Sequence, residues 1–203
     1  MRHPNRIILI SFLALFSQAS LATDSYYLSM SYGITSYDSS LSNPTGTAKL
    51  EEESNSSRLL VGVPLGIGGL IGEVYMADMG GISFTANSGD TVDVDGTTVT
   101  IPIDGYRKES ENIVGGFNFV YKFDVRFGYL TAKAGAMYWL STTKTTVNGA
   151  VTEEEEKSNV NALAGLGYEF PASKMLSIRL EYEYSQIDDD PVSNISLGVF
   201  VGF

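Results

Sequence analysis

The sequence predicts an all-β fold, an eight-stranded antiparallel up-and-down transmembrane β-barrel. Three observations predict it: eight segments alternate apolar and polar residues, short and long connections alternate between them, and outward-facing aromatic residues fall at two levels. A period of two is the signature of a strand with one apolar face. After residue 22 the sequence holds neither a convincing helical period nor an apolar run long enough for a transmembrane helix.

The first 22 residues have the three parts of a secretory signal peptide. Arg2 and Arg6 supply positive charge, residues 7–16 form an apolar run, and Ser20 and Ala22 fit a small-residue cleavage site. We expect residues 1–22 to be a signal peptide and residues 23–203 to form an outer-membrane β-barrel domain. The alternative is an uncleaved helical anchor, for which the apolar run is short.

Charge and residue usage exclude several classes of function. Beyond residue 22 the chain has 11 basic and 24 acidic residues, a net charge of −13, so we expect no nucleic-acid partner. Cys is absent, which rules out disulfides and thiolate metal sites. The single His is His3, inside the expected signal peptide.

Eight segments carry the period-two pattern. They are roughly Ser25–Tyr37, Arg58–Leu65, Leu70–Asp78, Ile113–Lys122, Tyr129–Ser141, Asn159–Phe170, Met175–Ile187 and Asn194–Phe203. One parity of each is apolar and the other is rich in charge, Gly and Ser. Such a sheet is either half of a soluble sandwich or a barrel with lipid outside and a polar interior.

The connections distinguish these two folds. Those after the second, fourth and sixth segments are short, whereas residues 38–57, 79–112, 142–158 and 188–193 form long polar connections. This alternation is typical of outer-membrane barrels, which have short periplasmic turns and long extracellular loops. Asp95-Gly96 and Asn148-Gly149 favour type I′ turns, so two long connections are expected to be protruding β-ribbons.

Outward aromatic residues provide independent support for a membrane barrel, because they collect where girdles at the two interfaces are expected. The outer level has Tyr138, Tyr182 and Tyr184, and the inner level has Phe119, Tyr121, Tyr168, Phe170 and Phe203.

The segments NALAGLGYEF, LSIRLEYEYSQI and SLGVFVGF resemble the small OmpA-like outer-membrane β-barrel family of Gram-negative bacteria. The resemblance covers residues 23–203. It implies residence in the cell outer membrane, contact with outer-membrane lipid and lipopolysaccharide, and handling by the barrel-assembly machinery. Larger relatives carry a peptidoglycan-binding domain after the barrel, and that function is not expected here because no residue follows Phe203.

The final segment is expected to close the barrel by pairing with the first, since an open strand edge is not tolerated in lipid. Phe203, Val201 and Val199 are expected to face outward. The family resemblance further implies that this terminal alternation ending in Phe is the signal read by the assembly machinery.

Several charged residues fall on the inward parity. They are Glu73, Lys133, Arg179, Glu181, Glu183 and Glu169, with Lys122 at a strand end. An eight-stranded interior is just wide enough for side chains, and buried charges are costly unless paired. We predict a packed salt-bridge network centred on Glu73, Lys133 and Arg179. The alternative is a gated ion path through the lumen.

The acidic residues are concentrated outside the strands, since 17 of the 24 fall in the four long connections. The densest clusters are Glu51, Glu52 and Glu53; Glu153, Glu154, Glu155 and Glu156; and Asp188, Asp189 and Asp190. One interpretation is a solvated surface that keeps the loops soluble. The other is capture of divalent cations, which clustered carboxylates suit. We predict no tight Ca²⁺ binding, no metal site and no cofactor.

The sequence therefore predicts an outer-membrane protein with a structural or surface-interaction role, in envelope integrity or adhesion, through acidic extracellular hairpin loops. Its surface ligand or host partner is not encoded in period or charge. Enzymes of the resembled type use a histidine near the outer rim, so we predict no enzyme activity. The alternatives are a narrow ion-conducting pore and a soluble lipocalin-like barrel in the periplasm.

Overall fold

The computed structural model describes residues 26–188 and 190–203, and every regular element in this part of the chain is a β-strand. The strands are β1 (Tyr27–Tyr37), β2 (Leu41–Ser42), β3 (Lys49–Glu51), β4 (Glu53–Pro64), β5 (Leu70–Gly80), β6 (Ser83–Ala86), β7 (Thr91–Val94), β8 (Thr97–Thr100), β9 (Tyr106–Val125), β10 (Gly128–Val147), β11 (Ala150–Pro171), β12 (Leu176–Ile187) and β13 (Asp190–Gly202). Across the described ranges, no helix is sufficiently long and apolar to span a bilayer.

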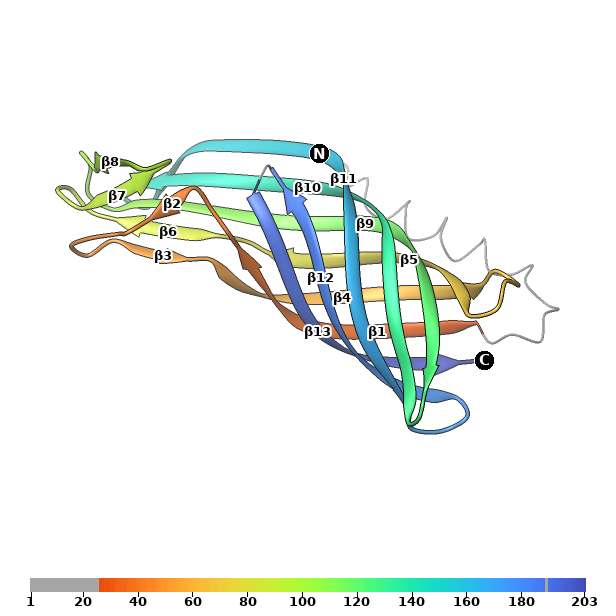
Figure 1. Ribbon diagram of the computed structural model, residues 1–203. Helices are drawn as coiled ribbons and strands as arrows, with labels where there is room; N and C mark the ends of the chain where they lie inside the picture. The colour runs from red at the N-terminus through yellow and green to blue at the C-terminus, as the bar shows by residue number, and fades with distance from the viewer. Residues whose placement is uncertain (1–25, 189) are drawn as a thin grey trace, which may run out of the picture.

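Eight long strands form a closed antiparallel ring, in the order β1, β4, β5, β9, β10, β11, β12, β13 and back to β1 (Figure 1). The ring closes through eleven aligned positions, from Tyr27 opposite Gly202 to Tyr37 opposite Val192. Closure pairs the strands through most of the barrel, as a lipid environment requires, although the β11–β12 ladder ends at Ala164 opposite Tyr184. The predicted eight-stranded antiparallel barrel is confirmed.

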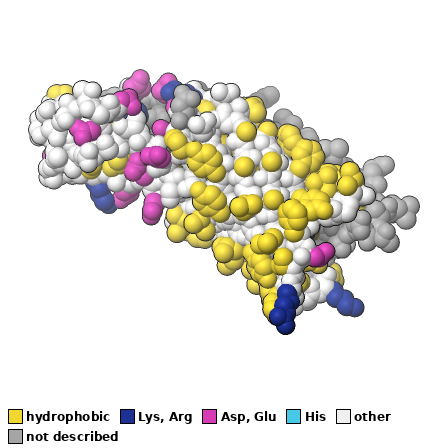
Figure 2. Space-filling model, in the orientation of Figure 1, with side chains coloured by type: hydrophobic (Ala, Val, Ile, Leu, Met, Phe, Trp, Pro, Cys, Tyr) yellow, Lys and Arg dark blue, Asp and Glu magenta, His cyan; other side chains and the backbone are white. Residues whose placement is uncertain are grey.

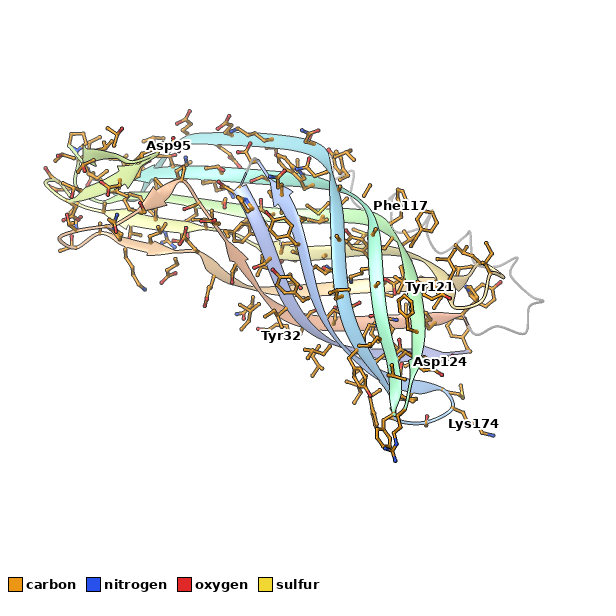
Figure 3. The ribbon with its side chains drawn as sticks, viewed as in Figure 1. Tyr32, Asp95, Phe117, Tyr121, Asp124 and Lys174 are labelled. Atoms are coloured by element: carbon orange, nitrogen blue, oxygen red, sulfur yellow. The ribbon has the colours of Figure 1, made fainter. Side chains whose placement is uncertain are left out.

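Apolar side chains cover the outside of the ring. On β1 the outward residues Leu28, Met30, Tyr32 and Ile34 are exposed, whereas Ser29, Ser31 and Thr35 between them are buried. Figure 2 shows the resulting apolar surface on the face of the barrel turned toward the viewer, and Figure 3 shows Tyr32, Phe117 and Tyr121 pointing away from the barrel. This arrangement is the reverse of a lipocalin-like barrel, which would hold its apolar parity inside.

On β9 and β10, which continue beyond the barrel, the outward-facing residues stop being apolar at the same level. The outward position changes from Ile113 to Glu111 on β9, and from Leu140 to Thr142 on β10. These two transitions coincide because Leu140 lies opposite Ile113 in the ladder. The apolar band therefore stops at one row of the sheet.

Beyond that row, the chain builds a second structure that we call the cap. It comprises β2, β3, β6, β7 and β8 with residues 106–112 of β9, 141–147 of β10 and 150–159 of β11. Residues 106–112 pair with β10, and β6 pairs with β9 and in turn with β3. The separate β2–β7–β8 sheet lies at the same end of the molecule (Figure 1).

The cap has a hydrophobic core of its own. Phe84, Ala86, Val92 and Ile101 are buried together, with Leu41, Ala48, Leu50, Val94 and Tyr106 packed against them. These residues come from two connections that are far apart in sequence. The long connections are therefore folded against each other.

Two glycine-containing turns have the backbone geometry that their sequences predict. Asp95 and Gly96 join β7 to β8 with φ of 50° and 75°, and Asn148 and Gly149 join β10 to β11 with φ of 51° and 79°. Positive φ at both central residues is the mark of a type I′ hairpin turn. The expected β-ribbons are present at both places.

Some expected boundaries differ from the structure. β9, β10 and β11 are 20 to 22 residues long, because the ladder continues into the cap. The connection expected at residues 188–193 is shorter, since β12 ends at Ile187 and β13 begins at Asp190. The expected signal peptide, residues 1–22, lies outside the described residues.

Candidate functional site

The barrel interior is organised around β12, whose inward positions carry alternating charged residues. Arg179, Glu181 and Glu183 are two residues apart, so all three side chains point to the same face of the strand. Each is at most 2% exposed. Period-two placement thus lines up one cation and two carboxylates along the lumen axis.

Arg179 is the centre of the part of this interior that lies nearer the short turns. Its guanidinium donates to Glu73 Oε1 at 2.7 Å, to Glu169 Oε2 at 2.8 Å and to Glu181 Oε1 at 3.2 Å. It also lies 3.9 Å from the ring centroid of Phe200. One planar cation with five donors therefore serves three carboxylates from three strands.

Lys133 and Arg58 complete the part of the interior that lies nearer the cap. Lys133 Nζ donates to Glu181 Oε1 at 2.9 Å and also contacts Glu183. Arg58 forms a two-pronged ion pair with Glu183 and stacks over the Tyr75 ring at 4.7 Å. Arg58 comes from β4, across the lumen from β12.

At the short-turn end the network finishes on Glu169. This carboxylate accepts from Lys122 Nζ at 2.8 Å and from Ser177 Oγ at 2.9 Å, in addition to Arg179. Nearby, Tyr27 donates its hydroxyl to Glu73 Oε1 at 2.5 Å. Lys122 is less buried than the others because it lies where the lumen opens.

Two glycines make room for these side chains. A Cβ added at Gly165 would lie 2.8 Å from Lys133 Cε, and one added at Gly62 would lie 2.1 Å from the Tyr27 ring. Contacts this short do not occur between real side chains. Glycine on the inward parity therefore allows Lys133 and Tyr27 to cross the narrow interior.

We call the eight ionisable residues the lumen network: Arg58, Glu73, Lys122, Lys133, Glu169, Arg179, Glu181 and Glu183. All six residues assigned to the lumen from sequence lie in it. Four carboxylates face four cations, so the network is neutral. Arg58 was not among the sequence-based candidates, although the excess of carboxylates in that set indicates missing cations.

The acidic clusters of the long connections lie mostly on strands. Glu51 is on β3, Glu53 begins β4, and Glu153–Glu156 form part of β11 opposite Thr142–Thr145. For Glu153–Glu156 this agrees with the β-ribbon expected around Asn148-Gly149, because the β10–β11 ladder extends far beyond the barrel. Glu52 accepts from Ser39, and Asp188 accepts from Lys157 Nζ at 2.9 Å. Asp190 begins β13, and Asp189 is outside the described residues.

The outer part of β11 has an open edge. Its pairing with β12 ends at Ala164, opposite Tyr184, so residues 150–163 pair only with β10. Where the ladder has ended, two contacts still connect β11 to the end of β12 and the residue after it. Lys157 donates to Asp188, and Asn161 Nδ2 donates to the Gln186 carbonyl. Charges on an edge strand oppose edge-to-edge pairing, and Glu153–Glu156 lie on this one.

Asp90 fixes the cap loops. Its carboxylate accepts from the backbone amides of Asn87 at 2.8 Å and Thr47 at 2.9 Å, and from Thr47 Oγ1 at 2.7 Å. The Asn87 amide, followed by the Thr47 groups, holds the pKa of Asp90 below its usual value. Asp90 thus ties together two connections that are separated by more than forty residues.

The C-terminal residues assigned to the assembly signal face outward. Val199, Val201 and Phe203 are exposed, and the Phe203 amide donates to the Tyr26 carbonyl at 2.9 Å. Their role in assembly stays a prediction.

A protein-family model described as "Outer membrane protein beta-barrel domain" matches residues 8–203. The chain belongs to this family. Family and fold place the protein in the outer membrane, with its apolar band in lipid. Barrels of this kind have short periplasmic turns and long extracellular loops.

Solved structures support the same fold. The N-terminal barrel of OprF from Pseudomonas aeruginosa has a TM-score of 0.54 at 10% identity, over 89% of this chain and 100% of that chain. Ail from Yersinia pestis has a TM-score of 0.54 at 15% identity (88% and 98% covered), and Neisserial surface protein A has 0.53 at 13% (88% and 97%). No curated protein sequence matches the chain.

Proposed function

We propose that the protein is a closed, non-enzymatic outer-membrane anchor that presents the cap at the cell surface for interaction with other molecules, in adhesion or envelope integrity. The observation that carries this proposal is the cap core around Phe84 and Val92. A chain that needed only to cross the membrane would have no use for a packed structure beyond it. The proposal of no enzyme activity rests on the absence of histidine beyond His3.

The cap surface favours a partner with basic groups. Acidic side chains gather between the apolar barrel surface and the end of the cap (Figure 2). On its outward face, Glu109, Glu51 and Glu154 have basic neighbours, whereas Glu111 and Glu156 flank Thr142 in the same row. One neighbour, Ail, was solved with the heparin analogue sucrose octasulfate. A polyanion of that type is a poor match for this acidic surface.

The test compares bacteria that display the wild type with bacteria that display the double variant Glu111→Gln, Glu156→Gln, which removes the two carboxylates that flank Thr142. We expect adherence to a surface coated with a basic protein, such as lysozyme, to fall in the double variant and at high salt. Heat-modifiable migration on a gel checks that both barrels are folded. Equal adherence by both strains would contradict the proposal.

A narrow pore is the weaker candidate, because the lumen network fills the described interior with paired side chains. In a planar bilayer, the purified protein is expected to show no steady conductance. A large and persistent single-channel current would favour the pore instead.

A further inference from the structure

A cavity of about 410 Å³ lies at the outer mouth of the barrel, under the β2–β7–β8 sheet. Its volume is within the range of small-molecule sites. The lining residues come from β1, β2, β6, β7, β8, β9, β10 and the β12–β13 turn. The cavity therefore exists only because the cap is folded over the barrel, and it is separate from the lumen network.

The two walls of the cavity differ in chemistry. One is apolar and consists of Leu41, Val92, Val94, Val99 and Ile101. The other follows the inward positions of β9, with Asn112 at its base and Lys108 toward the end of the cap. Asp188, which accepts from Lys157, and Asp190 also line the cavity. Val99 is 41% exposed.

Asn112 presents an unpaired acceptor at the base. The residue is 2% exposed, and its Nδ2 donates to the Tyr37 hydroxyl at 3.0 Å. Within the described part of the chain, its Oδ1 has no hydrogen-bond partner. Leaving a buried acceptor unsatisfied is costly, so this atom marks a position for a donor from outside the chain.

Lys108 presents a cation at the other end. Among the described residues, no carboxylate forms an ion pair with it, although acids are abundant in the cap. Lys108 and Asn112 are four residues apart on one face of a strand, which separates their Cα atoms by about 13 Å. The cavity thus offers an acceptor, an apolar wall and a cation in sequence.

We propose that this cavity binds an elongated organic acid with an apolar body, whose carboxylate pairs with Lys108 and whose hydroxyl or amine donates to Asn112 Oδ1. The apolar body would cover the exposed face of Val99. This site acts independently of any macromolecular partner of the cap, so it can be tested with purified protein alone.

The test uses the full protein in lipid nanodiscs and isothermal titration with 6-hydroxy-2-naphthoate, which has a carboxylate, two apolar rings and a hydroxyl. Empty nanodiscs give the background. We expect saturable binding, weakened about fivefold to tenfold by loss of either polar contact. 2-Naphthoate, which lacks the hydroxyl, and 2-naphthol, which lacks the carboxylate, report each contact from the ligand side.

Lys108→Gln and Asn112→Ala report the same contacts from the protein side, and Lys49→Gln on the outward face of β3 is the matched control. If Asn112→Ala loosens the cap, seen as altered melting, the exposed Lys108→Gln still decides the question. Binding weakened by Lys108→Gln and unchanged by Lys49→Gln supports the site. No saturable heat above background, or equal affinity of the wild type and Lys108→Gln, overturns it.

Discussion

The outward face of the strands that the barrel and the cap share is apolar in the barrel and charged in the cap. On β9, the outward residues Phe117 and Phe119 are about half exposed within the barrel, whereas the outward residues Arg107, Glu109 and Glu111 are charged in the cap. Both interiors bury apolar residues: the barrel holds a buried apolar cluster beside the lumen network, and the cap has a hydrophobic core of its own. The solvent outside each part, lipid or water, therefore decides the polarity of the outward face of an otherwise continuous ladder.

Charges also have different roles in the two regions. In the barrel, the Arg179–Glu73 pair has both side chains fully buried. In the cap, the Lys144–Glu154 pair has side chains 44% and 55% exposed. A buried pair is expensive to break, because the remaining charge is left without water, whereas an exposed pair contributes little. Four substitutions test this contrast.

The largest effect is expected for Arg179→Met. It leaves Glu73, Glu169 and Glu181 without their shared cation, and removal of one partner from a buried pair costs about 3–5 kcal/mol. Urea unfolding of the vesicle-inserted protein, followed by fluorescence of the single Trp139, measures the change in unfolding free energy. Lys174→Met, at the exposed β11–β12 turn, is the control. A loss below about 1 kcal/mol would indicate that the network is not essential to the barrel.

Phe117→Arg tests the outer face of the barrel. A charge on the lipid face near the bilayer centre costs about 2–4 kcal/mol. The same substitution at Glu111, on the same face of β9 but beyond the apolar band, should cost less than about 1 kcal/mol. The same unfolding assay compares the two variants. Similar losses of unfolding free energy would indicate that the apolar band does not end at the row of Ile113.

Glu154→Gln tests the exposed pair with Lys144. We expect a loss of about 0.2–1 kcal/mol that disappears in 1 M salt, where exposed charges are screened. Hydrogen exchange of the β10–β11 amides at low and high salt provides the measurement. A loss that persists at high salt would show that the carboxylate has a structural role in the cap.

Asp90→Asn is expected to act only within the cap and only as a function of pH. Because hydrogen bonds from Asn87 and Thr47 lower the folded-state pKa of Asp90, its stabilising contribution is present above the unfolded value of about 3.9. It is lost as the pH falls through the lower folded-state pKa. The protection factor of the Thr47 amide, which compares its exchange rate with the intrinsic rate at the same pH, should fall between pH 6 and pH 2 in the wild type. In the variant this fall should be absent, and an unchanged profile would assign the transition to another group.

The strand count, the outward parity and the two β-ribbons could be predicted from sequence, because lipid contact imposes an apolar residue at every second position. The packing of the cap could not. Its short strands β2, β3 and β6 are held by pairing and packing between distant connections, which leaves no periodic signal. Asp190 was not assigned to a strand because acidic residues favour a connection.

The lumen network was only partly predictable for a different reason. The six residues assigned from sequence carry four negative and two positive charges, and a buried interior does not tolerate such an excess. Lys122, noted at a strand end, reduces this excess, and counting charges would have directed attention to Arg58, at the first position of an expected strand. The cavity under the β2–β7–β8 sheet had no equivalent signal, since it depends on how that sheet is placed over β9.

The neutrality of the lumen network limits how this barrel can change over time. Replacement of any single member leaves an unmatched charge in a largely buried interior. Tolerated changes should therefore arise as coupled pairs, such as Arg58 together with Glu183, whose combined cost is smaller than the sum of the separate costs. The cap, with its exposed and screened charges, carries no such coupling, so its surface can vary one residue at a time while the barrel below it stays the same.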